Sequence, residues 1–237
     1  MNKKGVNLSV CVPALNEEKS LRTAVQDLLS TLSPSFSGLE IIIVNDASTD
    51  LTSRLADQLA KDYPYVKVIH HSRQKGLGAC YRDAARIASG DYLTWFPGDH
   101  ENSAEEFIQC LEYLKEDTIV TCHHRGRDPR SLPRRCISRI FTWLINRLFC
   151  LNMKYYNGLA IFPMSVIRSL PLVSNGFLFT AENLVRALKH GYKVVELSAP
   201  LKRRERGESN ALTFRSLKSI MQDVLHILLD KRKKDIL

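Results

Sequence analysis

Short hydrophobic runs alternate with longer amphipathic segments through the first half of the chain. Five runs rich in aliphatic and β-branched residues predict strands over residues 8–12, 40–45, 66–71, 91–96 and 118–122. Between them, hydrophobic residues recur at helical spacing, which predicts helices over residues 17–32, 50–62, 76–88 and 103–115. This alternation is typical of a mostly parallel sheet with helices on both faces. We therefore expect an α/β fold that binds ligands at the carboxyl ends of its strands.

Two amphipathic stretches stand out in the second half. Residues 134–150 place six hydrophobic residues on one helical face, with Arg135 and Arg139 opposite and Trp143 on the flank. Residues 212–229 repeat the pattern and are followed by the basic run 231–234. Both patterns are typical of a helix packed on a core and of a helix lying in the interface of an anionic membrane. The longest aliphatic run, 41–44, is too short to cross a bilayer.

Charge is divided unevenly along the 237 residues, whose net charge is +9. Residues 1–124 carry 12 basic and 17 acidic side chains, whereas residues 125–237 carry 22 basic and 8 acidic ones. The basic half predicts an anionic partner such as a phosphate group, a nucleic acid or a membrane surface. No nucleic-acid-binding motif accompanies the charge, so we expect no nucleic-acid partner.

Cysteine usage and the start of the chain favour a cytoplasmic protein. The six cysteines form no C-x-x-C pair, and no Cys/His group has zinc-site spacing, which indicates reduced thiols. The residues Met1-Asn2-Lys3-Lys4 lead into a predicted strand and do not resemble a signal peptide. The doublet His70-His71 ends a strand without a third ligand nearby, so a metal role there is not favoured.

Four loops that follow predicted strands carry the polar residues of a candidate site. They are residues 12–18, 44–50, 75–78 and 95–102. In the second of them, Asp46 lies at a strand tip without a helix-capping role, so it is placed to accept hydrogen bonds from a ligand. In the third, Gly76 opens a helix where backbone N–H groups can approach an anion. In the fourth, Asp99 and Glu101 are two residues apart, an arrangement of carboxylates suited to Mg²⁺ or Mn²⁺.

In this order and spacing, the loops resemble those of the family 2 glycosyltransferases of the GT-A fold, which use nucleotide-sugar donors. Features further along the chain are similar to the dolichyl-phosphate mannosyltransferase and polyprenyl-phosphate glycosyltransferase branch. The resemblance covers almost the whole chain and implies one compact domain with a Rossmann-like, mostly parallel central sheet flanked by helices. The motifs that carry it are Val-Pro-x-x-Asn-Glu-Glu (12–18), Val-x-Asp-x-Ser-x-Asp (44–50), Gly-x-Gly (76–78), Ser-Gly-Asp-Tyr (89–92), Gly-Phe (176–177) before a helix, Gly-Tyr-Lys-Val-Val-Glu (191–196) and Arg-x-x-Gly-x-Ser (204–209).

The resemblance also implies roles for individual residues. Asp99 and Glu101 would hold the divalent ion that bridges the donor diphosphate. Residues 1–124 would form the nucleotide-sugar-binding half of the domain, and residues 125–237 the acceptor- and phosphate-binding half. The donor would be contacted by Pro13, Ala14, Glu17, Asp46, Gly76 and Asp99. The donor or acceptor phosphates would be met by Arg125, Arg135, Arg204 and Ser209.

The implied reaction takes a sugar from a UDP- or GDP-sugar to a polyprenyl phosphate with inversion, at the cytoplasmic face of a membrane to which the protein binds peripherally. A phosphate acceptor is already anionic, so the enzyme need only position it and stabilise the leaving diphosphate, with Asp99 and Arg204 in catalytic roles. A hydroxyl acceptor would instead need a general base, for which Glu182 is the candidate. A carboxylate in a first helical turn also has a structural role open to it.

The sequence departs from the family pattern in its metal loop. The usual Asp-x-Asp-x-Gln reads Pro97-Gly98-Asp99-His100-Glu101, so the first carboxylate is lost and a later one is added. Asn210 replaces the usual lysine after Ser209. These changes leave open a protein that binds nucleotide sugars with weakened catalysis.

Overall fold

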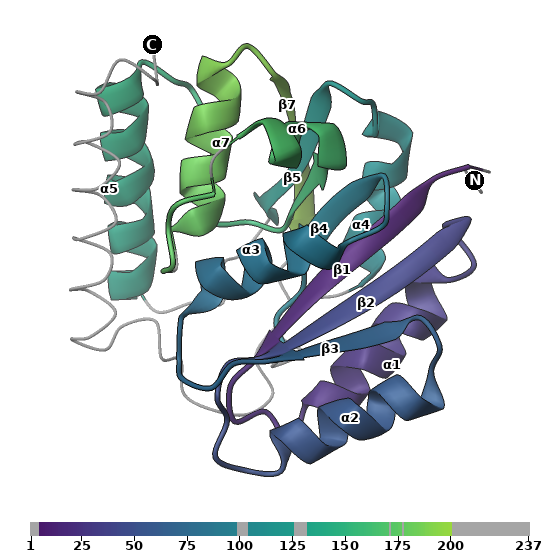
Figure 1. The fold of residues 1–237 in the computed structure, drawn as a ribbon. Coiled ribbons are helices and arrows are strands. Elements are labelled where there is room, and N and C mark those ends of the chain that lie inside the picture. Colours follow the sequence, from purple (N-terminus) through teal and green to yellow (C-terminus); the bar gives the residue numbers. More distant parts are fainter. Residues whose placement is uncertain (1–4, 99–103, 126–131, 171, 177, 201–237) are drawn as a thin grey trace.

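The computed structural model describes residues 5–98, 104–125, 132–170, 172–176 and 178–200. These residues form one seven-stranded sheet in the order β3-β2-β1-β4-β6-β5-β7, with helices on both faces (Figure 1). The strands are β1 (Asn7–Ala14), β2 (Gly38–Asn45), β3 (Val66–His70), β4 (Tyr92–Trp95), β5 (Thr118–Arg125), β6 (Ala160–Pro163) and β7 (Lys193–Pro200). The helices are α1 (Leu21–Leu32), α2 (Thr52–Asp62), α3 (Leu77–Ile87), α4 (Glu105–Cys110), α5 (Leu132–Phe149), α6 (Met164–Ser169) and α7 (Phe179–Lys189).

The sheet is mostly parallel, as the sequence predicts. Strands β1 to β4 pair in parallel, and β5 pairs in parallel with β7. Strand β6 runs antiparallel to both β4 and β5 and joins the two parallel groups into one sheet. The sequence analysis missed β6 because its four residues are all buried, and so short an apolar run carries no periodicity.

Both faces of the central strands are buried, which explains their continuous hydrophobic sequence. In β2, Ile41 and Ile43 pack into one hydrophobic core, whereas Ile42 and Val44 pack into the other. The first core includes buried residues of α1, α2 and α4, and the second includes residues of α3, α5, α6 and α7. The sheet contains strands from both the acidic half, residues 1–124, and the basic half, residues 125–237.

Several predicted boundaries were wrong by a few residues. Helix α1 begins at Leu21 and not at residue 17, because residues 17–20 form a turn closed by the Glu17 carbonyl, which accepts hydrogen bonds from the N–H groups of Ser20 and Leu21. The predicted helix 103–115 is shorter, since α4 is followed by the 3₁₀ turn Leu111–Tyr113. The predicted helix 212–229 and the basic run 231–234 lie outside the described residues.

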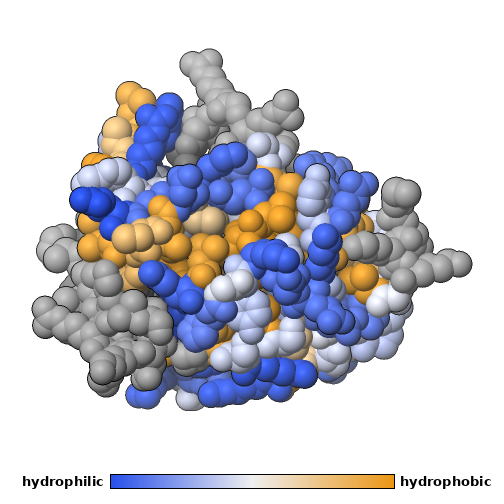
Figure 2. All heavy atoms as spheres, turned by 90° about the horizontal axis from the view of Figure 1, so that it is seen from above, coloured by the Kyte–Doolittle hydropathy of each residue, from blue (hydrophilic) through white to orange (hydrophobic). Residues whose placement is uncertain are grey.

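Helix α5 has one apolar side toward the core and further apolar residues toward solvent. Ile145 and Phe149 are buried, whereas Ile140 is 62% exposed and Trp143 is 65% exposed. Figure 2 shows hydrophobic side chains gathered on the side of the molecule where α5 lies in Figure 1. Among the described helices, none has the length and hydropathy needed to cross a bilayer.

Candidate functional site

The order of the strands reverses at β1 and β4, so the carboxyl ends of these two strands form a topological switch point. The chain adds β2 and β3 on one side of β1 and then returns to add β4 on the other side. In open α/β sheets, ligands bind at such a reversal. Gly98, which follows β4, packs on the loop after β1, because a Cβ atom on Gly98 would lie 3.0 Å from the Pro13 carbonyl oxygen and 3.6 Å from both Ala14 Cβ and Glu17 Cγ. The predicted donor residues of β1 therefore adjoin the start of the acidic loop.

Polar motif residues bind the loops after β1 and β2 to each other. The backbone N–H of Asn16 donates to Ser48 Oγ at 3.0 Å, and Asn16 Oδ1 accepts from the Thr49 N–H at 2.8 Å. The Glu18 N–H donates to Asp50 Oδ2 at 3.2 Å, and Glu18 Oε2 accepts from the Leu51 N–H at 3.1 Å. The sequence analysis missed this reciprocal pairing, although two polar motifs after neighbouring parallel strands were its signal.

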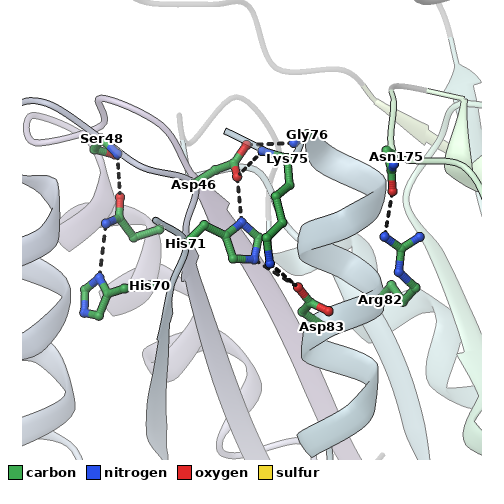
Figure 3. A network of polar contacts seen from close by, with 10 residues as sticks. Asp46, Ser48, His70, His71, Lys75, Gly76, Arg82, Asp83 and Asn175 are labelled. Atoms are coloured by element: carbon green, nitrogen blue, oxygen red, sulfur yellow. Dashed lines mark hydrogen bonds and ion pairs between the residues drawn. The ribbon is translucent and has the colours of Figure 1, made fainter. Parts of the chain in front are cut away.

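Asp46 holds the start of α3. Its side chain is buried, with 5% of the residue exposed, and its carboxylate accepts hydrogen bonds from the N–H groups of Lys75 at 2.8 Å and Gly76 at 2.9 Å (Figure 3). The expectation that Asp46 has no helix-capping role is therefore wrong. The anion at the N-terminus of α3 is the Asp46 carboxylate, and the Gly76 N–H is occupied by it. Contact of Asp46 and Gly76 with a donor stays a prediction.

The second glycine of the Gly-x-Gly motif allows a loop to approach α3 closely. A Cβ atom on Gly78 would lie 2.2 Å from the Ser174 carbonyl oxygen, and the Gly78 N–H donates to the Asn175 carbonyl at 3.0 Å. Arg82 of α3 reaches the same loop, with Nη2 2.6 Å from Asn175 Oδ1 (Figure 3). The motif thus has a packing function that its sequence did not reveal.

Glu182 is engaged by protein donors on both carboxylate oxygens. Its Oε1 accepts hydrogen bonds from Nε and Nη2 of Arg186, each at 2.8 Å, and its Oε2 accepts from the Ser174 N–H at 2.8 Å. Both side chains of the ion pair are 5% exposed. The carboxylate therefore ties α7 to the loop that packs on α3.

Comparison with known proteins assigns the family. Residues 9–168 match the glycosyl transferase family 2 domain. The chain belongs to this family. The chain is 28% identical over 215 residues to dolichol-phosphate mannosyltransferase of Pyrococcus furiosus, an alignment that covers 86% of this chain and 59% of the relative. It is 28% identical over 142 residues to undecaprenyl-phosphate 4-deoxy-4-formamido-L-arabinose transferase of Pectobacterium carotovorum, which covers 60% of this chain and 43% of the relative.

The chain thus spans less than two thirds of the length of these curated relatives. Their names agree with the polyprenyl-phosphate branch that the motifs indicated. Its fold is similar to glucosyl-3-phosphoglycerate synthase of Mycobacterium tuberculosis, crystallised with Mg²⁺ and UDP, with a TM-score of 0.67 at 16% identity over 92% of this chain and 79% of that one. The predicted GT-A fold is confirmed.

The structure describes two of the remaining predicted site residues, Arg125 and Arg135. Arg125 ends β5, and because β5 and β4 both run antiparallel to β6, its backbone lies at the same edge of the sheet as the end of β4. Arg135 is half-buried near the start of α5. The predicted metal ligands Asp99 and Glu101, and the predicted phosphate-binding residues Arg204 and Ser209, lie outside the described residues.

Proposed function

We propose that this glycosyltransferase moves a sugar from a nucleotide-sugar donor to a polyprenyl phosphate with inversion of the anomeric carbon. An acceptor phosphate oxygen attacks that carbon and forms the new bond, while the nucleoside diphosphate leaves with the electron pair of the broken bond. Two relatives named for transfer involving dolichol phosphate or undecaprenyl phosphate support this acceptor.

The observation that carries the proposal is the engagement of Glu182. A hydroxyl acceptor requires a base that takes its proton. Glu182 already accepts three hydrogen bonds from the protein and compensates the buried charge of Arg186. Taking up a proton there would remove the negative charge that lies 2.8 Å from the Arg186 guanidinium, which is costly in a buried site. A phosphate acceptor needs no such base, so it fits this arrangement better.

The donor pocket would lie at the switch point, where the carboxyl ends of β1 and β4 meet. Pro13, Ala14 and Glu17 adjoin the entry to the acidic loop through Gly98. Carboxylates at Asp99 and Glu101 offer the oxygen ligands that Mg²⁺ and Mn²⁺ prefer. When bound, the ion would neutralise charge on the donor diphosphate. Asp46 and Gly76 would border the same pocket from β2 and α3, which lie beside β1.

The acceptor would be met by the basic half of the chain, residues 125–237. Arg125 and Arg135, together with Arg204 and Ser209, would bind phosphate groups of the acceptor or the donor. The exposed apolar residues of α5 would enter the headgroup region of an anionic membrane, where polyprenyl phosphates reside. The protein would then act peripherally at the cytoplasmic face, with residues 1–124 serving the donor.

A reconstitution assay tests this function. The purified chain is incubated with UDP- and GDP-sugars carrying a radiolabel, with Mg²⁺, Mn²⁺ or chelator, and with undecaprenyl or dolichyl phosphate in vesicles. We expect label in the lipid extract only when the ion and the lipid phosphate are both present. The matched control is the free polyprenol of equal chain length, and transfer to it would contradict the phosphate acceptor. Absence of turnover and hydrolysis with every sugar would instead support the catalytically weakened protein.

A further inference from the structure

His71 is buried between two carboxylates from different elements. It directly follows β3, and its side chain is 1% exposed. Its Nδ1 lies 2.6 Å from Oδ1 of Asp46, at the end of β2, and its Nε2 lies 3.1 Å from Oδ2 of Asp83, on α3 (Figure 3). The Asp46–His71–Asp83 group thus joins the donor side of the sheet to α3.

Both ring nitrogens of His71 face carboxylate oxygens. A neutral imidazole carries one N–H, so it can donate to one carboxylate only. Only a ring with both protons donates to Asp46 and Asp83 together. The titratable and charged groups around the ring are Asp46 from the end of β2, Asp83 and Cys80 from α3, Lys75 from the β3–α3 loop and, through Asp83, Arg86.

Hydrogen bonds explain the close approach of these side chains better than a bound metal ion does. Ligand atoms of Asp46, His71 and Cys80 all lie within 4.8 Å of one another, which is compact enough for an ion. However, the Asp46 oxygen that faces the ring also accepts a hydrogen bond from the Lys75 N–H, and the second Asp46 oxygen accepts one from the Gly76 N–H, so the carboxylate is already engaged by protein donors. The 2.6 Å separation of His71 Nδ1 and Asp46 Oδ1 is that of a short hydrogen bond between the two side chains.

The His71 ring contacts the carboxylate of Asp46, which in turn holds the turn before α3. The same Asp46 oxygen that accepts from His71 also accepts from the Lys75 N–H, and the second oxygen accepts from Gly76. Asp83 is held from the other side by Lys75 Nζ at 3.3 Å and Arg86 Nη1 at 2.6 Å. A ring with a single N–H would donate to only one of the two carboxylates, so it could no longer hold Asp46 and Asp83 together at the start of α3.

We propose that His71 is a positioning residue of the donor pocket, which as an imidazolium holds Asp46 and the Lys75–Gly76 turn in the nucleotide-binding arrangement. The proposal rests on the proposed function, in which Asp46 and Gly76 border the donor nucleotide. Nucleotide affinity then falls as the pH rises and the ring loses its second proton.

Calorimetry with UDP and GDP, each with Mn²⁺, tests this role between pH 5.5 and 9. His71→Gln keeps one amide donor for Asp46 but has no charge, so we expect about tenfold weaker binding at the acid end and a smaller fall with pH than in the wild type. The matched control is His70→Gln, which changes the neighbouring histidine, 37% exposed and paired with Asp57. This control is expected to follow the wild-type pH profile.

Nitrogen NMR of the wild-type imidazoles reads the ring charge without any substitution. We expect two protonated nitrogens on His71 at pH 7, and the loss of one of these two protons at the pH where nucleotide affinity falls. A neutral ring at pH 7, a His71→Gln profile parallel to the wild type, or zinc bound by the Asp46, His71 and Cys80 group would overturn the proposal. If the wild type binds neither nucleotide at any pH, the proposed function itself fails, whatever the charge of the ring.

Discussion

The buried pair of Glu182 and Arg186 shows how a motif carboxylate can be committed to structure. The two side chains lie one helical turn apart on α7, and Glu182 also anchors the loop at Ser174. A buried carboxylate needs such partners because its desolvation is otherwise costly. The same reasoning applies to Asp46, whose carboxylate accepts hydrogen bonds from the turn at Lys75 and Gly76.

Paired substitutions separate a structural role of Glu182 from a role as base. Glu182→Gln and Arg186→Met each remove one member of a buried ion pair, so we expect each to lower the free energy of unfolding by about 3 kcal/mol. Below the unfolding temperature, both variants should keep kcat within about tenfold of wild type in the reconstitution assay. Denaturant unfolding and initial rates check this. A loss of kcat by several hundredfold in Glu182→Gln alone would identify Glu182 as a base.

At the level of elements, α5 combines a packed face with exposed apolar residues. Phe141 is partly buried against the second core, and Ile145 and Phe149 are fully within it. Ile140 and Trp143 are more than half exposed. A helix needs no such residues toward water for its own packing, and an interfacial helix uses them to enter the headgroup region.

We expect the double variant Ile140→Ser/Trp143→Ser to weaken binding to anionic phospholipid vesicles by at least tenfold. Both side chains are largely exposed, so the hydrophobic contribution lost is to the membrane and not to the core. Vesicle sedimentation and circular dichroism measure binding and folding. Tyr65→Ser is the control, because Tyr65 is 54% exposed and precedes β3 in sequence. Equal binding by the double variant and the wild type would contradict the membrane role of α5.

On the scale of the whole molecule, one sheet contains strands from both the acidic half, residues 1–124, and the basic half, residues 125–237. Strand β6 links strands β1 to β4 of the acidic half to β5, which ends at the charge boundary, and through β5 to β7 of the basic half. The proposed donor and acceptor sides therefore share one sheet. The carboxylates of the acidic half suit a divalent ion, and the arginines of the basic half suit phosphate groups. The charge boundary near residue 124 is thus a proposed boundary between substrates.

Thermal unfolding tests the ion dependence of the donor half. We expect UDP or GDP at 100 times its Kd with Mn²⁺ to stabilise the wild type by about 2.7 kcal/mol, because the ligand binds only the folded chain. The nucleotide with chelator should stabilise it far less. Asp99→Asn and Glu101→Gln are expected to lose most of the Mn²⁺-dependent gain, whereas Asp57→Asn, an exposed carboxylate on α2, should retain it. Full stabilisation of both loop variants would exclude these carboxylates as metal ligands.

The sequence by itself determined the fold class, the family and most elements. Alternating buried strands such as β1 and β2 leave a strong hydrophobic pattern, because each must be apolar on both faces. The ordered motifs after these strands were specific enough to indicate the family, since the carboxyl ends of parallel strands meet at one edge. Strand β6 was missed because four buried residues carry no period.

Only the tertiary structure decided what the motif side chains contact. Asp46 and Asp83 are far apart in the sequence, and nothing in either segment shows that His71 lies between them. Gly78 similarly has no room for a side chain, because a loop nearly a hundred residues later in the sequence packs on it. Such contacts depend on helix and strand packing, which local sequence patterns do not encode. The difference between a buried ion pair and a catalytic base at Glu182 is likewise a property of its neighbours in space.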